Sequence, residues 1–244
     1  MIQFEYKTKN DLENAFEDFK VLFAYHSNKI ENDEINYNDT REIFENGKIA
    51  GYSGDLRTLF EIQNQKDCYN FLLDKLVNRN PITNELILNV HKELTKGTYD
   101  ERRYEKGERP GEYKKGDYIV GKAEIGAPAN EVIKEIDELL KEINNEDSSD
   151  YLTIAAYFHL KFESIHPFAD GNGRVGRTLL NYYLIIHNIK PLIIYDEDKK
   201  LYYECLQAFD DKQDIEPLKK FIEYEQDKTW QKKKRSITKL ISFL

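Results

Sequence analysis

The sequence predicts an all-α fold, a helical bundle with one small β-hairpin, because apolar residues recur every three or four positions along most of its 244 residues. Only the glycine-rich stretch RPGEYKKGDYIVGKAEIGAP contains β-favouring pieces, on either side of Lys115, Gly116 and Asp117. No alternation of strands and helices occurs, and no internal repeat or low-complexity linker divides the chain. We therefore expect one large domain that folds without disulfides or a structural metal.

The clearest helical pattern, ANEVIKEIDELLKEINN, places its apolar residues on one stripe soon after Pro128. A second, ITNELILNVHKELTKG, lies between Pro81 and Gly97, which suit a helix start and a helix stop. Weaker patterns occur before and after these two. Helices are expected near residues 10–26, 55–78, 82–96, 129–144, 150–165, 174–188, 198–209 and 215–240.

Three parts of the chain follow from these patterns. We expect an N-terminal helical region at residues 1–78, a core at 79–225 with a hairpin flap near 111–125, and a basic helical tail at 226–244. The tail carries six cations between Lys228 and Lys239 beside Trp230. A solvated face of a terminal helix is the favoured interpretation, and contact with an anionic partner or a membrane surface is the alternative.

Composition narrows the class of protein. A formal net charge of -9 argues against nucleic-acid binding, which needs a basic face to neutralise phosphates. Cys68 and Cys205 form no disulfide framework, and the first residues lack a basic-then-apolar signal. Residues 182–186 form the longest uninterrupted apolar run, far short of the roughly 20 residues that span a bilayer. The chain is expected to be cytoplasmic and without a membrane span.

The stretch HPFADGNGRVGR, residues 166–177, has the backbone requirements of an anion site. Pro167 disfavours helix at His166, so the preceding helix should end there and leave the imidazole on a loop. Gly171 and Gly173 can adopt positive φ angles, which lets successive backbone N–H groups turn toward one point. The helical pattern then resumes, so this point lies at a helix N-terminus, where unpaired N–H groups also bind anions.

The charged side chains of this stretch indicate a bound triphosphate. Arg174 and Arg177 share a face of the first helical turn, where cations oppose the helix dipole unless an anion is present. Asp170 would repel that anion unless a divalent cation lay between them, and ATP with Mg²⁺ balances these charges. His166, with an ordinary pKa near 6.5, is then placed to accept a hydroxyl proton beside the phosphates.

Other interpretations of these residues fit the sequence less well. GNGRVG matches the dinucleotide pattern GxGxxG, with Asp196 about 20 residues on, but no strand precedes the glycines and no βαβ pattern follows. A zinc site on His159, His166 or His187 lacks HExxH spacing or thiolate partners, and His159 is more often an ordinary half-buried histidine. A purely structural loop with fortuitous arginines is the third alternative.

Residues 166–177 resemble the signature of Fic domain proteins, HxFx(D/E)GNGRxxR, at every specified position. SNKIEN, residues 27–32, is similar to the inhibitory (S/T)xxxE(G/N) helix of some members. RPGEYKKGDYIVG resembles their flap. The resemblance implies a Fic-type helical bundle that transfers AMP from ATP to a protein hydroxyl and releases pyrophosphate.

The resemblance also implies roles for individual residues. His166 would be the general base, Asp170 would hold Mg²⁺, and Phe168 would pack the loop onto the core. The phosphates would be held by Gly171, Asn172, Gly173, Arg174 and Arg177. The nucleotide pocket would be lined by Val120, Gly121, Lys122 and Ala123 of the flap and by Tyr202, Tyr203 and Asp210, although relatives often carry asparagine at the position of Asp210.

Ser27 and Glu31 are four residues apart, on one face of the first helix if it continues through Ile30. The Glu31 carboxylate could then pair bidentately with Arg177 in the place of the γ-phosphate, and ATP would bind unproductively. The alternative is a surface helix with an incidental serine and glutamate.

Three functions remain open at this stage. Adenylyl transfer to a Tyr, Thr or Ser hydroxyl, with autoinhibition by Glu31, is favoured. The alternatives are a de-AMPylating hydrolase that uses Glu31 to position water, and a non-catalytic module that senses nucleotide. Besides ATP, the expected partners are a target protein docked along the hairpin edge, the chain itself as a target, and a second copy in a homodimer.

Overall fold

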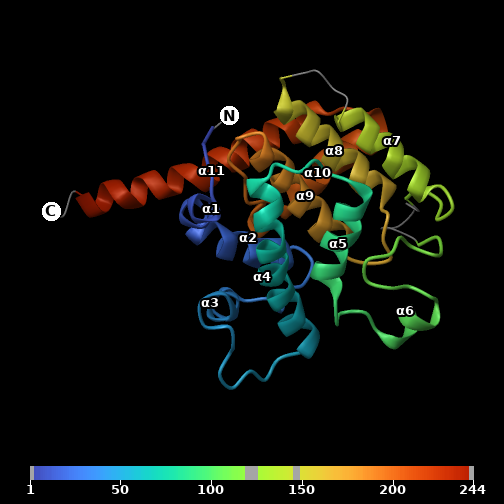
Figure 1. Cartoon of the computed structure of the whole chain (residues 1–244), viewed down its shortest axis with the longest axis horizontal. Coiled ribbons are helices and arrows are strands. Elements are labelled where there is room, and N and C mark those ends of the chain that lie inside the picture. Colours follow the sequence, from blue (N-terminus) through green and yellow to red (C-terminus); the bar gives the residue numbers. More distant parts are fainter. Residues whose placement is uncertain (1–2, 119–125, 145–148, 242–244) are drawn as a thin grey trace.

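The structure, a computed structural model, describes residues 3–118, 126–144 and 149–241, and this part of the chain is built from helices (Figure 1). An isolated antiparallel bridge joins Gln3 to Ile189, and no strand is formed within the described ranges. The predicted all-α class is confirmed. The helices are α1 (Lys9–Ala15), α2 (Glu17–Lys29), α3 (Tyr37–Asn46), α4 (Leu56–Val77), α5 (Asn84–Thr95), α6 (Glu101–Glu105), α7 (Val132–Asn144), α8 (Tyr151–Ile165), α9 (Asn172–Ile186), the 3₁₀ turn η1 (Asp196–Asp198), α10 (Lys199–Lys212) and α11 (Glu216–Ile241).

Side-chain caps fix where several helices begin. Asp55, Thr83 and Asp150 stand at the N-caps of α4, α5 and α8, and each accepts a hydrogen bond from a backbone N–H of the first turn. Such caps satisfy donors that the helix itself leaves unpaired, and each contributes about 1 kcal/mol. The starts of these three helices are therefore encoded locally.

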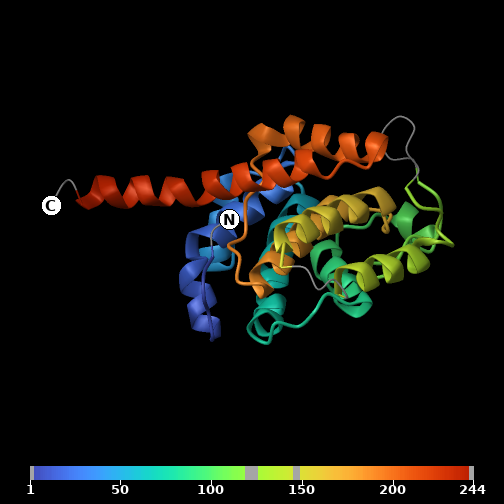
Figure 2. The ribbon, with the colours of Figure 1, turned by 90° about the horizontal axis from the view of Figure 1, so that it is seen from above.

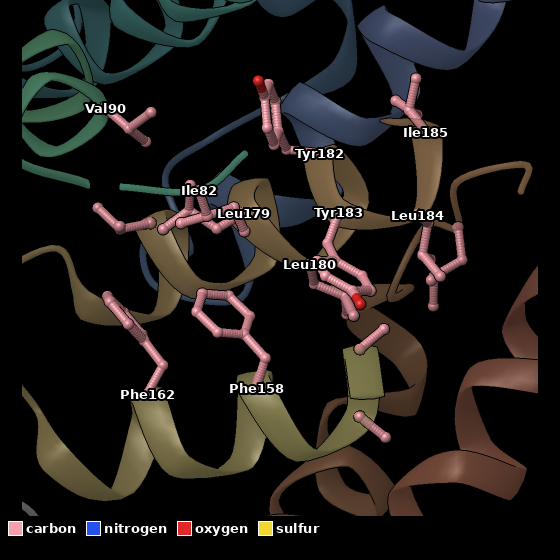
Figure 3. Packing of buried hydrophobic residues seen from close by; sticks show 14 of the residues in the cluster. Ile82, Val90, Phe158, Phe162, Leu179, Leu180, Tyr182, Tyr183, Leu184 and Ile185 are labelled. Carbon is pink, nitrogen blue, oxygen red and sulfur yellow. The ribbon is translucent and has the colours of Figure 1, made fainter. Parts of the chain in front are cut away.

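Helix α9 is the central element of the bundle. All its residues except Gly173 are buried, as expected for a helix surrounded on every side by others. Phe158 and Phe162 on α8 face Leu179 and Leu180 of α9 (Figure 3). This pairing holds the loop between α8 and α9, which contains the conspicuous twelve-residue stretch, against a rigid core.

The N-terminal helices share this core. Phe19 of α2 stacks on Trp230 of α11 with ring centroids 5.9 Å apart, and both side chains are buried. Helix α2 also packs against α4 and α9. Residues from the N-terminal region, the expected catalytic core and the start of the tail thus contribute to one hydrophobic cluster. The boundaries at residues 78 and 225 stay predictions.

Several elements differ from expectation. The pattern at residues 10–26 is two helices, α1 and α2, because the backbone of Phe16 leaves the helical region at φ -115° and ψ 18°. Helices α3 and α6 were not predicted, since α3 buries only Thr40 and Ile43 and α6 buries no residue. Residues 111–118 form no strand, and residues 119–125 lie outside the described residues, so the hairpin remains a prediction.

Helix α11 lies along the bundle, and its C-terminal half extends beyond it in both views (Figures 1 and 2). Trp230 fixes its middle by donating a hydrogen bond to the Pro191 carbonyl at 2.7 Å. Lys228, predicted on a solvated face, is instead mostly buried and pairs with Glu197 and Asp198. No helix within the described ranges has the length and apolar character that crossing a membrane requires.

Candidate active site

The loop that joins α8 to α9 has the predicted backbone shape at two positions. Helix α8 ends before His166, which adopts a left-handed conformation with φ 51° and ψ 62°. Gly171 is also left-handed, at φ 86°, and forms the N-cap of α9 without a side-chain cap. The first turn of α9 therefore keeps backbone donors for an anion.

The positive φ expected at Gly173 was wrong, because Gly173 lies within the first turn of α9. Its lack of a side chain matters for a different reason. A Cβ at residue 173 would lie 2.4 Å from Oε1 of Glu31 and 2.8 Å from Nη1 of Arg177. Glycine at this position is what lets those two side chains approach the helix.

Phe168 packs the loop onto the core, as predicted. Its ring is fully buried and stacks on His91 with centroids 3.7 Å apart. The Asn172 side chain then closes the loop, since it accepts from the Phe168 N–H and donates to the Phe168 carbonyl, both at 2.8 Å. The side-chain amide of Asn172 is thus engaged in holding the loop.

His166 is held as a neutral imidazole. The backbone carbonyl of Glu163 hydrogen-bonds the ring, which fixes one nitrogen as a donor and leaves the other as an acceptor. Burial, helped by the nearby Lys114 ammonium, lowers the pKa of His166 to about 4. The Nζ atom of Lys114 is itself buried and has no hydrogen-bond partner within the described part of the chain. At neutral pH the ring is therefore almost entirely unprotonated and able to accept a proton, while its lowered pKa makes it a weaker base than an ordinary imidazole.

A cavity of about 310 Å³ lies beside this imidazole. It brings together the expected base His166, the expected inhibitory Glu31 and five of the twelve residues that the sequence assigned to the nucleotide, namely Gly173, Arg177, Tyr202, Tyr203 and Asp210. It is also lined by residues that the sequence did not single out, namely Leu160, Glu163, Ser164, Leu206 and Gln207. Two of these, Glu163 and Ser164, directly precede the motif and could have been found by extending α8 to its last turn.

Glu31 and Arg177 form an ion pair at the edge of this cavity. Nη2 of Arg177 donates to Oε1 of Glu31 at 2.8 Å, and the Arg177 side chain is only 2% exposed. Arg177 also donates from Nε to the Ser27 hydroxyl at 3.2 Å and from Nη2 to the Ser27 carbonyl at 2.8 Å. The expected contact is present, through one carboxylate oxygen rather than two.

Further contacts hold residues 27–32, which we call the inhibitory segment after the family motif that they resemble. His26, directly before it, pairs with Asp196 of η1 at 2.6 Å, and Lys199 of α10 donates to the carbonyl of Ile30. Asn32 donates to the Thr58 hydroxyl at 3.1 Å and to Oε2 of Glu61 at 2.9 Å, both on α4. Glu31 is therefore held between two fixed neighbours.

Arg174 points away from Arg177. Its Nη1 atom lies 3.3 Å from Oε1 of the buried Glu61, and its Nη2 atom lies 3.4 Å from Oδ1 of Asp170. The two arginines of the first turn thus reach different acids, although they were expected to act on one anion. Arg174 and Asp170 line a second, polar cavity of about 550 Å³, and Glu31 stands at the border of both cavities.

Asp170 meets three guanidinium groups. Besides the contact with Arg174, Oδ2 of Asp170 accepts a hydrogen bond from Arg57 at 2.9 Å and forms an ion pair with Arg103 at 3.2 Å. Burial alone would raise the pKa of Asp170, but the three arginines outweigh it and the pKa is lowered. Asp170 is therefore an ionised carboxylate at neutral pH. Sequence patterns did not identify Arg57 or Arg103 as its partners.

Asp170 fits a magnesium ligand in this setting. Mg²⁺ typically takes one or two protein carboxylates and completes its shell with phosphates and water. The Oδ1 atom of Asp170 has only the long contact to Arg174, so it retains free lone pairs. Within residues 3–118, 126–144 and 149–241, no three His, Cys, Asp or Glu side chains are arranged to hold a metal without such help.

A buried polar cluster lies under the cavity. Burial raises the pKa of Glu163 to about 8, so its carboxyl group is largely protonated at neutral pH. His159, expected to be half-buried, is fully buried and hydrogen-bonds the Tyr202 hydroxyl at 2.8 Å. Gly176 makes room for this cluster, since a Cβ there would lie 2.2 Å from Oε1 of Glu163.

The flap is described only in part. Glu108 accepts hydrogen bonds from the Lys115 N–H and the Tyr118 hydroxyl, both at 2.8 Å. Asp117 accepts from the Ala129 N–H at 2.8 Å, near the start of α7. The four flap residues assigned to the nucleotide pocket, Val120, Gly121, Lys122 and Ala123, lie outside the described residues.

Comparison with known proteins agrees with this geometry. Protein adenylyltransferase fic-1 of Caenorhabditis briggsae is 28% identical over 236 residues, which cover 89% of this chain and 44% of that protein. Protein adenylyltransferase Fic of Aedes aegypti is 29% identical, over 88% of this chain and 42% of that protein. The chain thus spans less than half the length of the curated relatives it matches.

Solved structures show the same fold. A Fic domain containing signaling protein from Bacteroides thetaiotaomicron superposes with a TM-score of 0.79 at 22% identity, covering 90% of this chain and 88% of that one. Fic-1 from C. elegans gives a TM-score of 0.79 at 23% identity, covering 96% and 68%. Residues 81–184, from the start of α5 through most of α9, match the Fic/DOC family. The chain therefore contains a segment that matches the Fic/DOC family model, and it is similar to Fic proteins over most of its length.

Proposed function

We propose that the chain is a protein adenylyltransferase, which transfers AMP from Mg-ATP to a Tyr, Thr or Ser hydroxyl and releases pyrophosphate. The observation that carries the proposal is a single cavity lined by the neutral imidazole of His166 and by the buried guanidinium of Arg177 at the N-terminus of α9. Relatives named protein adenylyltransferase support the same reaction.

In this proposal His166 is the general base. Its acceptor nitrogen takes the proton of the target hydroxyl while that oxygen attacks the α-phosphorus, and the bond from the α-phosphorus to the bridging oxygen breaks to release pyrophosphate. Most of the rate comes from positioning and charge stabilisation. The hydrogen bond from the ring to the Glu163 carbonyl sets the ring orientation, and Phe168 fixes the loop that carries it.

The phosphates would be held by the first turn of α9. The backbone N–H groups of Asn172 and Gly173 face an anion there, and the side chains of Arg174 and Arg177 add two charges. Asp170 would hold Mg²⁺, which neutralises phosphate charge and orients the triphosphate. The adenine base of ATP would lie against Tyr202 and Tyr203, with Asp210 at the exposed rim of the cavity.

Glu31 would act as an inhibitor of this reaction. Its carboxylate occupies the Arg177 guanidinium, so a nucleotide must displace it before the γ-phosphate can take the same position. The displacement costs a charge-assisted hydrogen bond to a buried cation, which favours an unproductive pose of ATP. The target would lie along the flap, where an extended segment pairs by its main chain and little sequence is read.

Transfer of radiolabel from α-phosphate-labelled ATP tests the proposal. Wild-type protein, Glu31→Gly and Glu31→Gly/His166→Ala are each incubated with Mg-ATP and a lysate, and label on protein is measured. The label should increase in Glu31→Gly and fall by roughly 10²- to 10⁴-fold in the double variant, while ATP binding is kept. Glu34→Gln is the matched control, because Glu34 is exposed beside the same segment.

The outcome separates the alternatives. Label on this chain indicates self-modification, and label on another protein identifies the target. Binding of Mg-ATP by Glu31→Gly without any label on protein would contradict transfer and favour a nucleotide-sensing module. If Glu31→Gly is labelled to the same extent as wild-type protein, autoinhibition by Glu31 is contradicted, while adenylyl transfer still stands. Measurement of the molar mass of the purified protein in solution tests the expected homodimer.

A second function has one specific observation in its favour. Glu31 and His166 line the same cavity, so a water between them could be activated for hydrolysis of AMP from a modified target. Incubation of a labelled target with wild-type protein and with Glu31→Gly distinguishes the two functions. Release of label that needs Glu31 supports hydrolysis.

A further inference from the structure

Arg57 and Arg103 both bind the carboxylate of Asp170, although neither belongs to the twelve-residue motif. We propose that these two arginines compete with Mg²⁺ for Asp170 and thereby set the magnesium concentration at which the nucleotide site loads. The proposal rests on the proposed function, in which Asp170 is the metal ligand.

The contacts place both guanidinium groups on one of the two carboxylate oxygens that a metal could use. Oδ2 of Asp170 accepts a hydrogen bond from Nη2 of Arg57 at 2.9 Å and forms an ion pair with Nη2 of Arg103 at 3.2 Å. A magnesium ion needs a bare carboxylate oxygen at about 2.1 Å and tolerates little distortion of its shell. Oδ2 is occupied, and only Oδ1 is left, beside Arg174 at 3.4 Å.

Charge adds to this steric competition. Three guanidinium groups surround one carboxylate, so a divalent cation that approaches Asp170 is repelled while they stay in place. The same charges keep Asp170 from being an unpaired buried anion when no metal is bound, since its side chain is only 18% exposed. The arginines therefore substitute for the metal's charge in the nucleotide-free protein.

Both arginines are built to be released. Their side chains are 40% and 27% exposed, and they come from different elements, Arg57 from α4 and Arg103 from α6. Each has a second acid that keeps it paired after release. Nε of Arg57 lies 3.1 Å from Oε1 of Glu61, and Nη1 of Arg103 lies 3.2 Å from Oδ2 of Asp100. Release thus leaves no guanidinium without a partner, which a permanent structural salt bridge would not require.

Glu61 connects this contact to the inhibitory segment. Its two carboxylate oxygens hold Arg57 and Arg174 on one side and Asn32 on the other. Asn32 directly follows Glu31, whose carboxylate blocks Arg177. The inhibitory segment and the arginines on Asp170 are therefore parts of one hydrogen-bonded network, and they act on opposite ends of the triphosphate site.

Magnesium titration of ATP binding tests the proposal without relying on activity. The full chain with Glu31→Gly is dialysed against a fixed, sub-saturating concentration of labelled ATP while MgCl₂ is varied. Arg57→Gln together with Arg103→Gln should lower the magnesium concentration for half-maximal binding by roughly tenfold, as expected for loss of two partly exposed charge-assisted pairs. Arg103→Gln alone should give part of the shift. This substitution leaves Glu61 untouched, because the other acid that pairs with Arg103 is Asp100.

Matched variants complete the experiment. Arg102→Gln removes the same charge from an exposed position of α6 and should leave the magnesium half-point unchanged. In an Asp170→Asn background the arginine substitutions should no longer alter the metal dependence, because the group they compete for is gone. A persistent shift in that background would mean that the arginines act through the general electrostatic field.

The remaining outcomes of the magnesium titration also test the proposal. An unchanged magnesium concentration for half-maximal binding in the double arginine variant would overturn the proposal. A higher concentration would also overturn it, because the arginines would then help to hold the metal-bound nucleotide. Circular dichroism at each step shows that the variants are folded. If Glu31→Gly binds no ATP at any magnesium concentration, the proposed transferase itself fails, and this inference fails with it.

Discussion

The α-carbon of Gly173 faces the carboxylate of Glu31 so closely that no side chain fits between them. A Cβ at residue 173 would lie 2.4 Å from Oε1 of Glu31, well below the 3.0 Å under which real Cβ contacts essentially never occur. Because Gly173 has ordinary helical backbone angles, alanine there meets no backbone strain, and the clash with the side chains of Glu31 and Arg177 is its main effect.

Gly173→Ala should therefore destabilise the protein by about 1–3 kcal/mol, the usual cost of overpacking, by forcing Glu31 from Arg177. In a Glu31→Gly background the same substitution should cost at least about 1 kcal/mol less, because the carboxylate that it meets is gone. Urea unfolding of the four proteins measures this double-mutant cycle. Equal costs in both backgrounds would contradict the close contact.

The pH dependence of transfer should report the low pKa of His166. The neutral ring is the active base, so the rate falls as falling pH protonates it, and with a pKa of about 4 this occurs well below the ordinary value near 6.5. Initial-rate kcat/KM of Glu31→Gly protein should stay level from pH 8 to about 5.5. Activity recovered after return to pH 7.5 controls for acid unfolding, and an acid limb centred near 6.5 would contradict the prediction.

Ser27→Ala should release inhibition only in part. The substitution removes the hydrogen bond from Nε of Arg177 to the Ser27 hydroxyl but keeps the ion pair with Glu31. We expect labelling to rise roughly 2- to 10-fold, less than in Glu31→Gly, in line with one bond to a charged group. Ser53→Ala, on an exposed loop, is the control. Labelling equal to that of Glu31→Gly would mean that Ser27 alone holds the segment.

His159 should make the protein sensitive to acid. Burial first, and then the charge of Arg177, lowers its pKa to about 3, whereas in the unfolded chain it is near 6.5. Between these values the unfolded state binds one more proton, so the His159 contribution is fully present above about pH 6.5 and is lost as pH falls toward 3. Relative to His159→Gln, wild-type protein should lose about 1.4 kcal/mol per pH unit in this window. Parallel curves of unfolding free energy against pH would contradict it.

The sequence predicted the parts of the site that local backbone chemistry specifies. Pro167 and Gly171 force the loop that presents His166, and the four-residue spacing of Ser27 and Glu31 placed both toward one partner. The structure has the left-handed Gly171, the end of α8 and the contact with Arg177 where these features indicated, whereas Gly173 is helical.

The residues that the sequence did not reveal act over long separations. Arg57 meets Asp170 across 113 positions, and a charged residue on an exposed helix turn carries no periodic signal that names its partner. Glu163 was hidden for a different reason. An acid near the end of an amphipathic helix predicts a solvated position, and only the packing of α9 against α8 buries it. Helix α3 was not predicted because it buries too few residues to produce a helical pattern of apolar positions.

Helix α2, which ends at Lys29 within the inhibitory segment and leaves Glu31 in the following turn, is also a structural member of the bundle. Phe19 and Ala24 of α2 are buried in the main core, and residues of α2 and α4 enclose a small apolar cavity next to α9. Detaching α2 would expose this apolar surface and cost far more than one ion pair. Activation by a leaving helix would thus amount to partial unfolding. Rotation of the Glu31 side chain alone, with the backbone left in place, costs less free energy. An activated and a resting molecule should therefore have nearly the same backbone.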